Sequence, residues 1–254
     1  MATPIETLFE RELERRRIVF TKSSQACRYS VHTGATSVAV DLENLAREYQ
    51  IDHDADCVPR FLDAILERDS GAMLDWNQAR ESVLFGLEPN DYAESCDLRA
   101  PISRRVDRVP ILIHRRLGSW QWIMRDMLEG WKISMDDLTQ VAFANLAVAA
   151  ASSTVECAEI DGVTLGYFET SLPLKSSILL APNLREIVAP IIGWPLHAVV
   201  PDQDFVYVWP ADHEQFYERV GPIVLREYSA APHPVTTELF TIDDEGIRAV
   251  GAFA

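Results

Sequence analysis

The sequence contains little cysteine, with four residues in 254 and no CxxC or CxH spacing between any of them. Disulfide frameworks are typical of small secreted chains, and zinc sites need ligands at close, regular spacing. We therefore expect reduced thiols and no zinc site. The four positions are Cys27, Cys57, Cys96 and Cys157.

Long hydrophobic runs are also missing. The longest, Ala142–Ala151, contains Asn145 and is far shorter than the roughly 20 apolar residues that cross a bilayer. The N-terminal stretch MATPIETLFERELERRR mixes acids with bases, whereas a secretory signal has a basic segment followed by an apolar one. These features predict a cytoplasmic protein without a membrane segment.

Catalytic signatures are absent as well. The sequence has no GxSxG elbow, no phosphate-binding loop of the Walker type, no GxGxxG and no HExxH. Catalytic residues can also assemble from distant positions, so this absence does not exclude an enzyme. It leaves no residue to name as catalytic and no cofactor to expect, and it favours a non-enzymatic protein.

Basic residues are scarce in the C-terminal half. Residues 128–254 hold 6 Lys and Arg against 18 Asp and Glu, a net charge of −12, while residues 1–127 hold 17 against 21, a net charge of −4; together they give the −16 of the chain. A surface that acidic repels phosphate backbones, which disfavours nucleic-acid binding. It favours a protein partner with a basic surface, whereas the oligomeric state stays open.

Hydrophobic periodicity divides the chain into three regions. Residues 1–70 predict a small α-β-β-β-α unit, and residues 71–103 are irregular and expected to act as a linker that holds the domain boundary. Residues 104–254 predict a larger domain of hairpins and helices, in which Asp161-Gly162 is the strongest hairpin signal. The predicted class is α+β, with antiparallel sheets and helices packed on one side in two layers.

The individual elements follow from the same patterns. Ser134 is the expected N-cap of a helix, because Asp136 and Asp137 follow in its first turn. Helices are expected at 3–17, 42–49, 58–68, 135–151, 183–192 and 212–228. Strands are expected at 17–22, 27–32, 36–40, 108–115, 119–124, 156–160, 163–168, 196–200, 204–209, 235–242 and 247–250.

Several motifs of the C-terminal half resemble a known family. The order of MLEGWKISMDDLTQVAFANL, DGVTLGYFET, ILLAPNLREIV, AVVPDQDFVYV and PVTTELFTIDDEGIRAV, over roughly residues 106–250, resembles the YtpQ-like family of uncharacterised bacterial proteins. The most specific element is that family's Val-Pro-X-Gln-Asp hairpin, in which X is usually histidine and is Asp202 here. The resemblance implies an intracellular α+β protein and no particular activity.

The two aspartates of that hairpin, Asp202 and Asp204, allow two interpretations. A proline followed by Asp and Gln between two extended runs suits a tight turn, because Pro fixes φ and Asp can bond the backbone two residues further on. The same carboxylates could bind Mg²⁺ or Ca²⁺ with a third from elsewhere, such as Glu169 or Asp212. We favour the turn, since Asp is common in turns for local reasons.

The strand after the hairpin places Phe205, Tyr207 and Trp209 on one face and valines on the other. Core packing under the following helix is the favoured interpretation, and an aromatic face that is open to a partner is the alternative. The leading functional hypothesis is a non-enzymatic protein-binding module of the chaperone, adaptor or immunity type, which uses this acidic, aromatic-bearing half. Its candidate partner-binding residues are Phe205, Tyr207, Trp209, Asp202 and Asp204. The alternative is a metal-dependent hydrolase with carboxylate ligands around Asp202 and Asp204.

Overall fold

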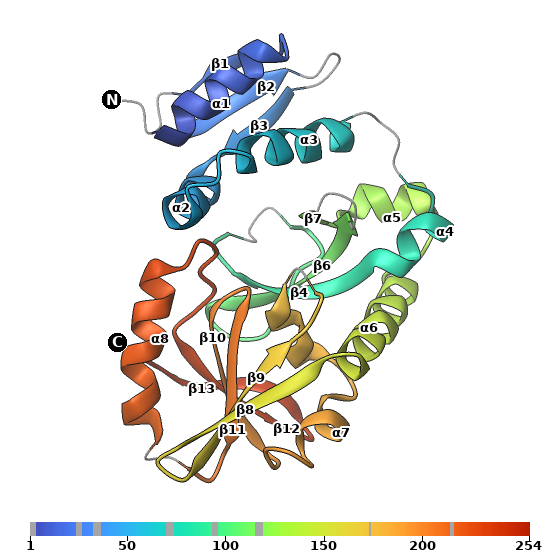
Figure 1. Cartoon of the computed structure of the whole chain (residues 1–254). Coiled ribbons are helices and arrows are strands. Elements are labelled where there is room, and N and C mark those ends of the chain that lie inside the picture. Colours follow the sequence, from blue (N-terminus) through green and yellow to red (C-terminus); the bar gives the residue numbers. More distant parts are fainter. Residues whose placement is uncertain are drawn as a thin grey trace. The chain divides into compact units, whose positions relative to one another are not determined.

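The computed structural model describes residues 4–23, 27–32, 37–69, 74–92, 96–114, 119–172, 174–213 and 216–254 (Figure 1). The chain divides into two compact units, Met1–Met73 and Leu74–Ala254, which we call unit 1 and unit 2. Each unit has its own hydrophobic clusters among the described residues.

Unit 1 packs three helices against a small antiparallel sheet. Its elements are α1 (Pro4–Arg15), β1 (Val19–Lys22), β2 (Arg28–His32), β3 (Ser37–Asp41), α2 (Glu43–Asp52) and α3 (Cys57–Asp69), with the strands in the order β1-β2-β3. Helix α1 buries Ile5, Phe9 and Leu13, which recur every four residues and therefore lie on one face. The succession of helix, three strands and helical segments follows the prediction for residues 1–70.

Unit 2 begins with a four-stranded sheet. Its elements are α4 (Trp76–Ala79), the 3₁₀ turn η1 (Arg80–Ser82), β4 (Val83–Pro89), β5 (Ala100–Pro101), β6 (Val106–His114) and β7 (Ser119–Trp122), with β6 paired to the other three strands. The expected linker at 71–103 thus contains regular structure that belongs to unit 2. Residues Val83–Glu88 are all buried, so this strand lacks the alternation of polar and apolar residues by which sequence patterns reveal strands.

The rest of unit 2 is built on a six-stranded antiparallel sheet. Its strands are β8 (Thr154–Ile160), β9 (Val163–Glu169), β10 (Leu196–Asp202), β11 (Phe205–Pro210), β12 (Glu238–Asp243) and β13 (Gly246–Ala252), in the order β13-β12-β10-β11-β9-β8. The accompanying helices are α5 (Arg125–Trp131), α6 (Met135–Ala151), η3 (Lys175–Leu180), α7 (Leu184–Val188) and α8 (Tyr217–Ala230). The β8–β9 turn has positive φ at both Asp161 and Gly162, as the sequence signal predicts.

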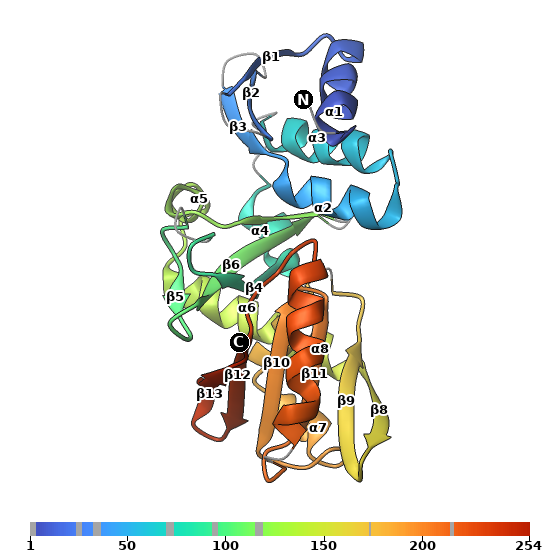
Figure 2. The same ribbon diagram turned by 90° about the vertical axis from the view of Figure 1, so that its left-hand side faces the viewer.

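Both faces of the six-stranded sheet pack against other elements. Helix α8 lies along one face (Figure 2), where Val199, Trp209 and Val220 belong to one apolar cluster. The opposite face contributes Ala198 and Val208 to a larger core, shared with β4, β6, α6 and η3. The face that a strand residue occupies therefore decides which of the two cores it joins.

The mixed α+β class with antiparallel sheets is confirmed. Helix α6 begins at the predicted cap, since the Ser134 side chain accepts from the Asp137 N–H while the Asp137 carboxylate accepts from the Ser134 N–H. Among the described helices, none combines the length and the apolar character that a bilayer span requires.

Candidate functional site

Asp202 closes the β10–β11 hairpin. It is buried, and its Oδ1 accepts a hydrogen bond of 2.8 Å from the backbone N–H of Asp204, as an aspartate in a turn does. Its Oδ2 accepts a second bond of 3.1 Å from the backbone N–H of His233, in the segment between α8 and β12. Both carboxylate oxygens therefore accept hydrogen bonds from backbone N–H groups, and the side chain holds two separate segments together.

Asp204 is more exposed than Asp202, at the tip of the hairpin, and its carboxylate accepts a hydrogen bond from the backbone N–H of Lys175. Partial loss of solvent and the neighbouring Asp202 carboxylate raise the pKa of Asp204 above its ordinary value. Within the part of the chain that the structure describes, no three His, Cys, Asp or Glu side chains come together as a metal site would need. Glu169 and Asp212 thus do not complete a site with the two aspartates.

Trp209 lies in the core rather than on an open face. Its exposed fraction is 0%, and its ring packs against those of Phe216 at 5.7 Å and His197 at 5.8 Å between centroids. Helix α8 covers this end of β11, so Trp209 does not reach a partner in this structure. The alternation along the strand indicates a shared face, but it does not show how far the helix extends over that face.

Phe205 and Tyr207 remain half-buried on the same face of β11. Their rings meet edge to face, with 4.3 Å between centroids. Tyr207 is paired in register with Tyr167 of β9, whose side chain is 40% exposed, so the two tyrosines are neighbours on one face of the sheet. Tyr167, Phe205 and Tyr207 form what we call the aromatic patch, and Tyr167 was missed because strand register is not visible in the sequence.

Acidic side chains border the aromatic patch. Glu156 of β8 is paired in register with Tyr167, and Glu169 follows Tyr167 by two residues and so shares its face. Burial raises the pKa of Tyr207, and the Glu227 carboxylate on α8 raises it further. Glu227 is paired with Arg226, whereas Glu156 and Glu169 have no ion pair with any described residue. The patch therefore combines aromatic surface with uncompensated negative charge.

A buried carboxyl group lies beneath the hairpin. Gln203 donates from Nε2 to Oε1 of Glu88 on β4 at 2.9 Å, which joins the two sheets of unit 2. Glu88 is 0% exposed, and its Oε2 has no hydrogen-bond partner among the described residues. Loss of solvent raises the pKa of Glu88 to about 8, against smaller lowerings by Gln203 and Trp122. Near neutral pH, Glu88 is mainly protonated.

Comparisons with protein-family models, with curated proteins and with solved structures return no match. The resemblance to the YtpQ-like family over residues 106–250 therefore stays a prediction.

Proposed function

We propose that the protein is a non-enzymatic protein-binding module, of the kind that chaperones, adaptors and immunity proteins represent, and that unit 2 binds a partner with a basic surface. The observation that carries the proposal is the aromatic patch: Tyr167, Phe205 and Tyr207 lie together on a sheet face that α8 does not fully cover. Aromatic side chains are enriched at interfaces, because they bury large areas at a low entropic cost.

Charge supports the same assignment. Glu156 and Glu169 border the patch, and residues 128–254 have a net charge of −12, from 6 basic and 18 acidic side chains. Complementary charge at the rim of an interface speeds association and excludes partners of the wrong sign. Within this proposal the tyrosines and Phe205 supply contact area, the carboxylates select a cationic partner, and Asp202 maintains the hairpin that carries Phe205.

The test is affinity purification with quantified recovery, at low and at high salt, from an extract of the source cells. One variant removes aromatic area (Tyr167→Ala with Tyr207→Ala), and a second reverses the rim charge (Glu156→Lys with Glu169→Lys). A third, Glu129→Lys with Asp136→Lys, makes the same change in net charge at exposed positions on α5 and α6.

We expect one partner in stoichiometric amount at low salt, with recovery that falls as salt rises. The aromatic and rim variants should each reduce recovery at least about tenfold, while the α5–α6 control retains the partner. The proposal is wrong if no stoichiometric partner appears at low salt, or if the rim variant and the control bind it equally.

A further inference from the structure

Unit 2 contains a half-open cavity of about 440 Å³ on the side of the six-stranded sheet that faces the larger core. Most of the residues that line it are apolar, and two cations also line it, Arg108 of β6 and Arg185 of α7. The apolar walls include Phe143 of α6, Leu180 of η3, Trp194 before β10, and Ile242 and Ile247 of the β12–β13 hairpin. The volume is typical of a site for a small organic molecule.

Arg108 is held in an unusual environment for a cation. Its guanidinium carbon lies 4.5 Å from the ring centre of Phe85 and 5.3 Å from that of Phe143, so the group is stacked on two aromatic faces. Its Nε is buried without a hydrogen-bond partner, and the guanidinium makes no ion pair with any residue that the structure describes. Loss of solvent accordingly lowers the pKa of Arg108.

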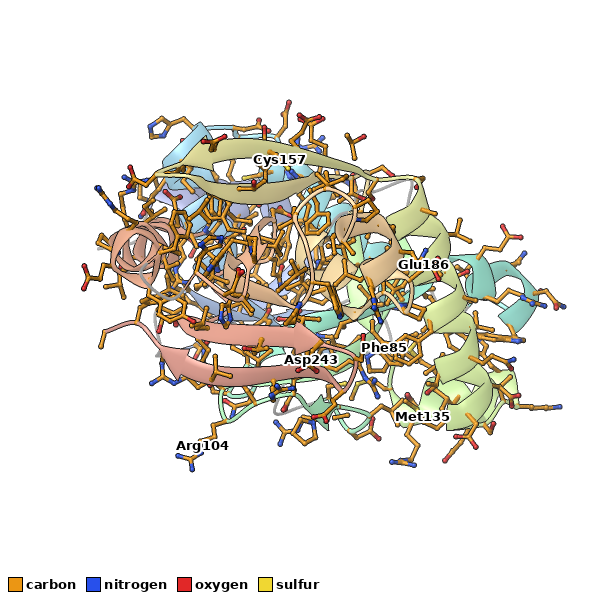
Figure 3. All side chains as sticks on the ribbon, turned by 90° about the horizontal axis from the view of Figure 1, so that it is seen from below. Phe85, Arg104, Met135, Cys157, Glu186 and Asp243 are labelled. Carbon is orange, nitrogen blue, oxygen red and sulfur yellow. The ribbon has the colours of Figure 1, made fainter. Side chains whose placement is uncertain are left out.

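The other charged side chains that line the cavity each have a partner of opposite charge, and the three acids among them outnumber the bases. Arg185 binds Asp244 through both carboxylate oxygens, at 2.8 and 3.0 Å, and the Trp194 indole donates to the same carboxylate at 3.0 Å. Asp243 is paired with Arg248 at 2.6 Å. Phe85 and Asp243, both labelled in Figure 3, mark the strands β4 and β12 that flank this region. Arg108 is thus the cation at the cavity that still lacks a described counter-charge.

A half-desolvated guanidinium without an anion is unfavourable, and cation–π contacts offset this only in part. Its planar fork of donors matches a carboxylate, which it binds through two parallel hydrogen bonds. We propose that this cavity binds a small organic carboxylate, with the carboxylate on Arg108 and its apolar body against Phe143, Trp194 and Ile242. This site is separate from the aromatic patch and does not depend on the function proposed for it.

The acidic rim explains the choice of a carboxylate over a phosphate. Asp243, Asp244 and Glu245 all line the cavity, and a phosphate monoester carries a charge of about −1.5 to −2 near neutral pH. A carboxylate carries a single charge and meets less repulsion from these side chains. The Arg108 guanidinium therefore suits an apolar acid with a single negative charge better than a nucleotide or a sugar phosphate.

Calorimetric titration of the full chain with 3-phenylpropanoate and octanoate tests the proposal, with the change in total tryptophan fluorescence as a second readout. The uncharged 3-phenylpropanamide and inorganic phosphate serve as comparison ligands. The variants are Arg108→Gln, Arg108→Lys and the control Arg104→Gln. Arg104 is exposed and, in Figure 3, points away from the molecule, so its loss makes the same charge change outside the cavity. Near-UV circular dichroism checks that each variant is folded.

We expect saturable binding of at least one of the two carboxylates, weakened at least about tenfold by Arg108→Gln and unchanged by Arg104→Gln. Arg108→Lys keeps the charge but loses the planar fork of donors, so its affinity for the carboxylate should lie between those of Arg108→Gln and Arg104→Gln. The amide should not bind measurably. The proposal fails if neither carboxylate binds, if the amide or phosphate binds as well as the carboxylates, or if binding survives in Arg108→Gln. If Arg108→Gln does not fold, the proposal is overturned when Arg108→Lys binds the carboxylate as tightly as wild type does.

Discussion

Asp202 and Asp204 are separated by one residue, and we expect them to affect the stability of the fold differently at neutral pH. Asp202 accepts from two backbone N–H groups, whereas the more exposed Asp204 accepts from one, that of Lys175, and lies near the charge of Asp202. We expect Asp202→Ala to lower the free energy of unfolding by about 1–3 kcal/mol, because two backbone donors lose their acceptor. Urea denaturation at pH 7 measures the change.

Asp204→Asn is the matched control for Asp202→Ala. The folded-state pKa of Asp204 is raised, so its stabilising contribution is present at low pH and is lost as pH rises through that pKa. At pH 7 the asparagine variant should be as stable as wild type or more stable. If both changes destabilise the protein equally, the distinction between a structural and an exposed aspartate is wrong.

The raised pKa of Glu88 should make the free energy of unfolding depend on pH. Its folded-state pKa of about 8 exceeds its ordinary value of 4.5, so the stabilisation is complete below pH 4.5 and is lost as pH rises to about 8. The loss is on the order of 5 kcal/mol, at about 1.4 kcal/mol for each pKa unit between the two values.

The matched variant is Glu88→Gln, which keeps the shape and has no charge to gain. The difference in unfolding free energy between the variant and wild type should grow in the variant's favour from pH 5 to pH 8. Parallel stability curves for the two proteins would show that Glu88 does not titrate in this range.

For single residues, the sequence predicts local hydrogen bonds better than it predicts which side chains are buried. The turn role of Asp202 followed from Pro201 and the short spacing to Asp204, because such turns depend on neighbouring residues. The core packing that the sequence favours for this strand holds for Trp209, whereas nothing in the sequence indicates that Glu88 is buried. The burial of Trp209 depends on α8, and the burial of Glu88 depends on a bond to Gln203, which is 115 residues away in the sequence.

Strand β9 packs closely against the segment after α7 at Gly166. A Cβ added at Gly166 of β9 would lie 2.2 Å from Cδ1 of Ile192 and 3.2 Å from Cγ2 of Val208. We expect Gly166→Ala to lower the thermal midpoint and to cost about 1–3 kcal/mol of stability, as overpacked core sites do.

Gly251→Ala on β13 provides the comparison, because a Cβ there meets nothing within 4 Å. Its thermal midpoint should match that of wild type. A tolerated Gly166→Ala would mean that Ile192 moves aside at little energetic cost.

Elements with strong local signals were predicted well. Helix α1 has its apolar stripe, α6 has its cap at Ser134, and the β8–β9 hairpin has Asp161-Gly162. Strand β4 was missed because both of its faces are buried, and α5 because its seven residues are too few for a periodic pattern. Helix α8 begins at Tyr217, after the predicted start at residue 212.

On the scale of the whole molecule, the two units have separate cores. The cluster that contains Phe9, Tyr29 and Leu62 lies within residues 1–73, and the other two clusters lie within residues 74–254. We expect residues 74–254, expressed alone, to unfold cooperatively and to give well-dispersed amide spectra. A fragment with collapsed, poorly dispersed spectra would contradict two independent cores.

The end position of β8 in the six-stranded sheet bears on how molecules behave in concentrated solution. Its outer row of backbone groups has no strand partner among the described elements, and such a row is a template for edge-to-edge stacking of copies. Glu156 and Glu159 on that strand make no ion pair with described residues, so two copies that approach along it repel each other. That protection weakens as the pH falls toward the isoelectric point of about 4.7, where acid precipitation should begin along this edge.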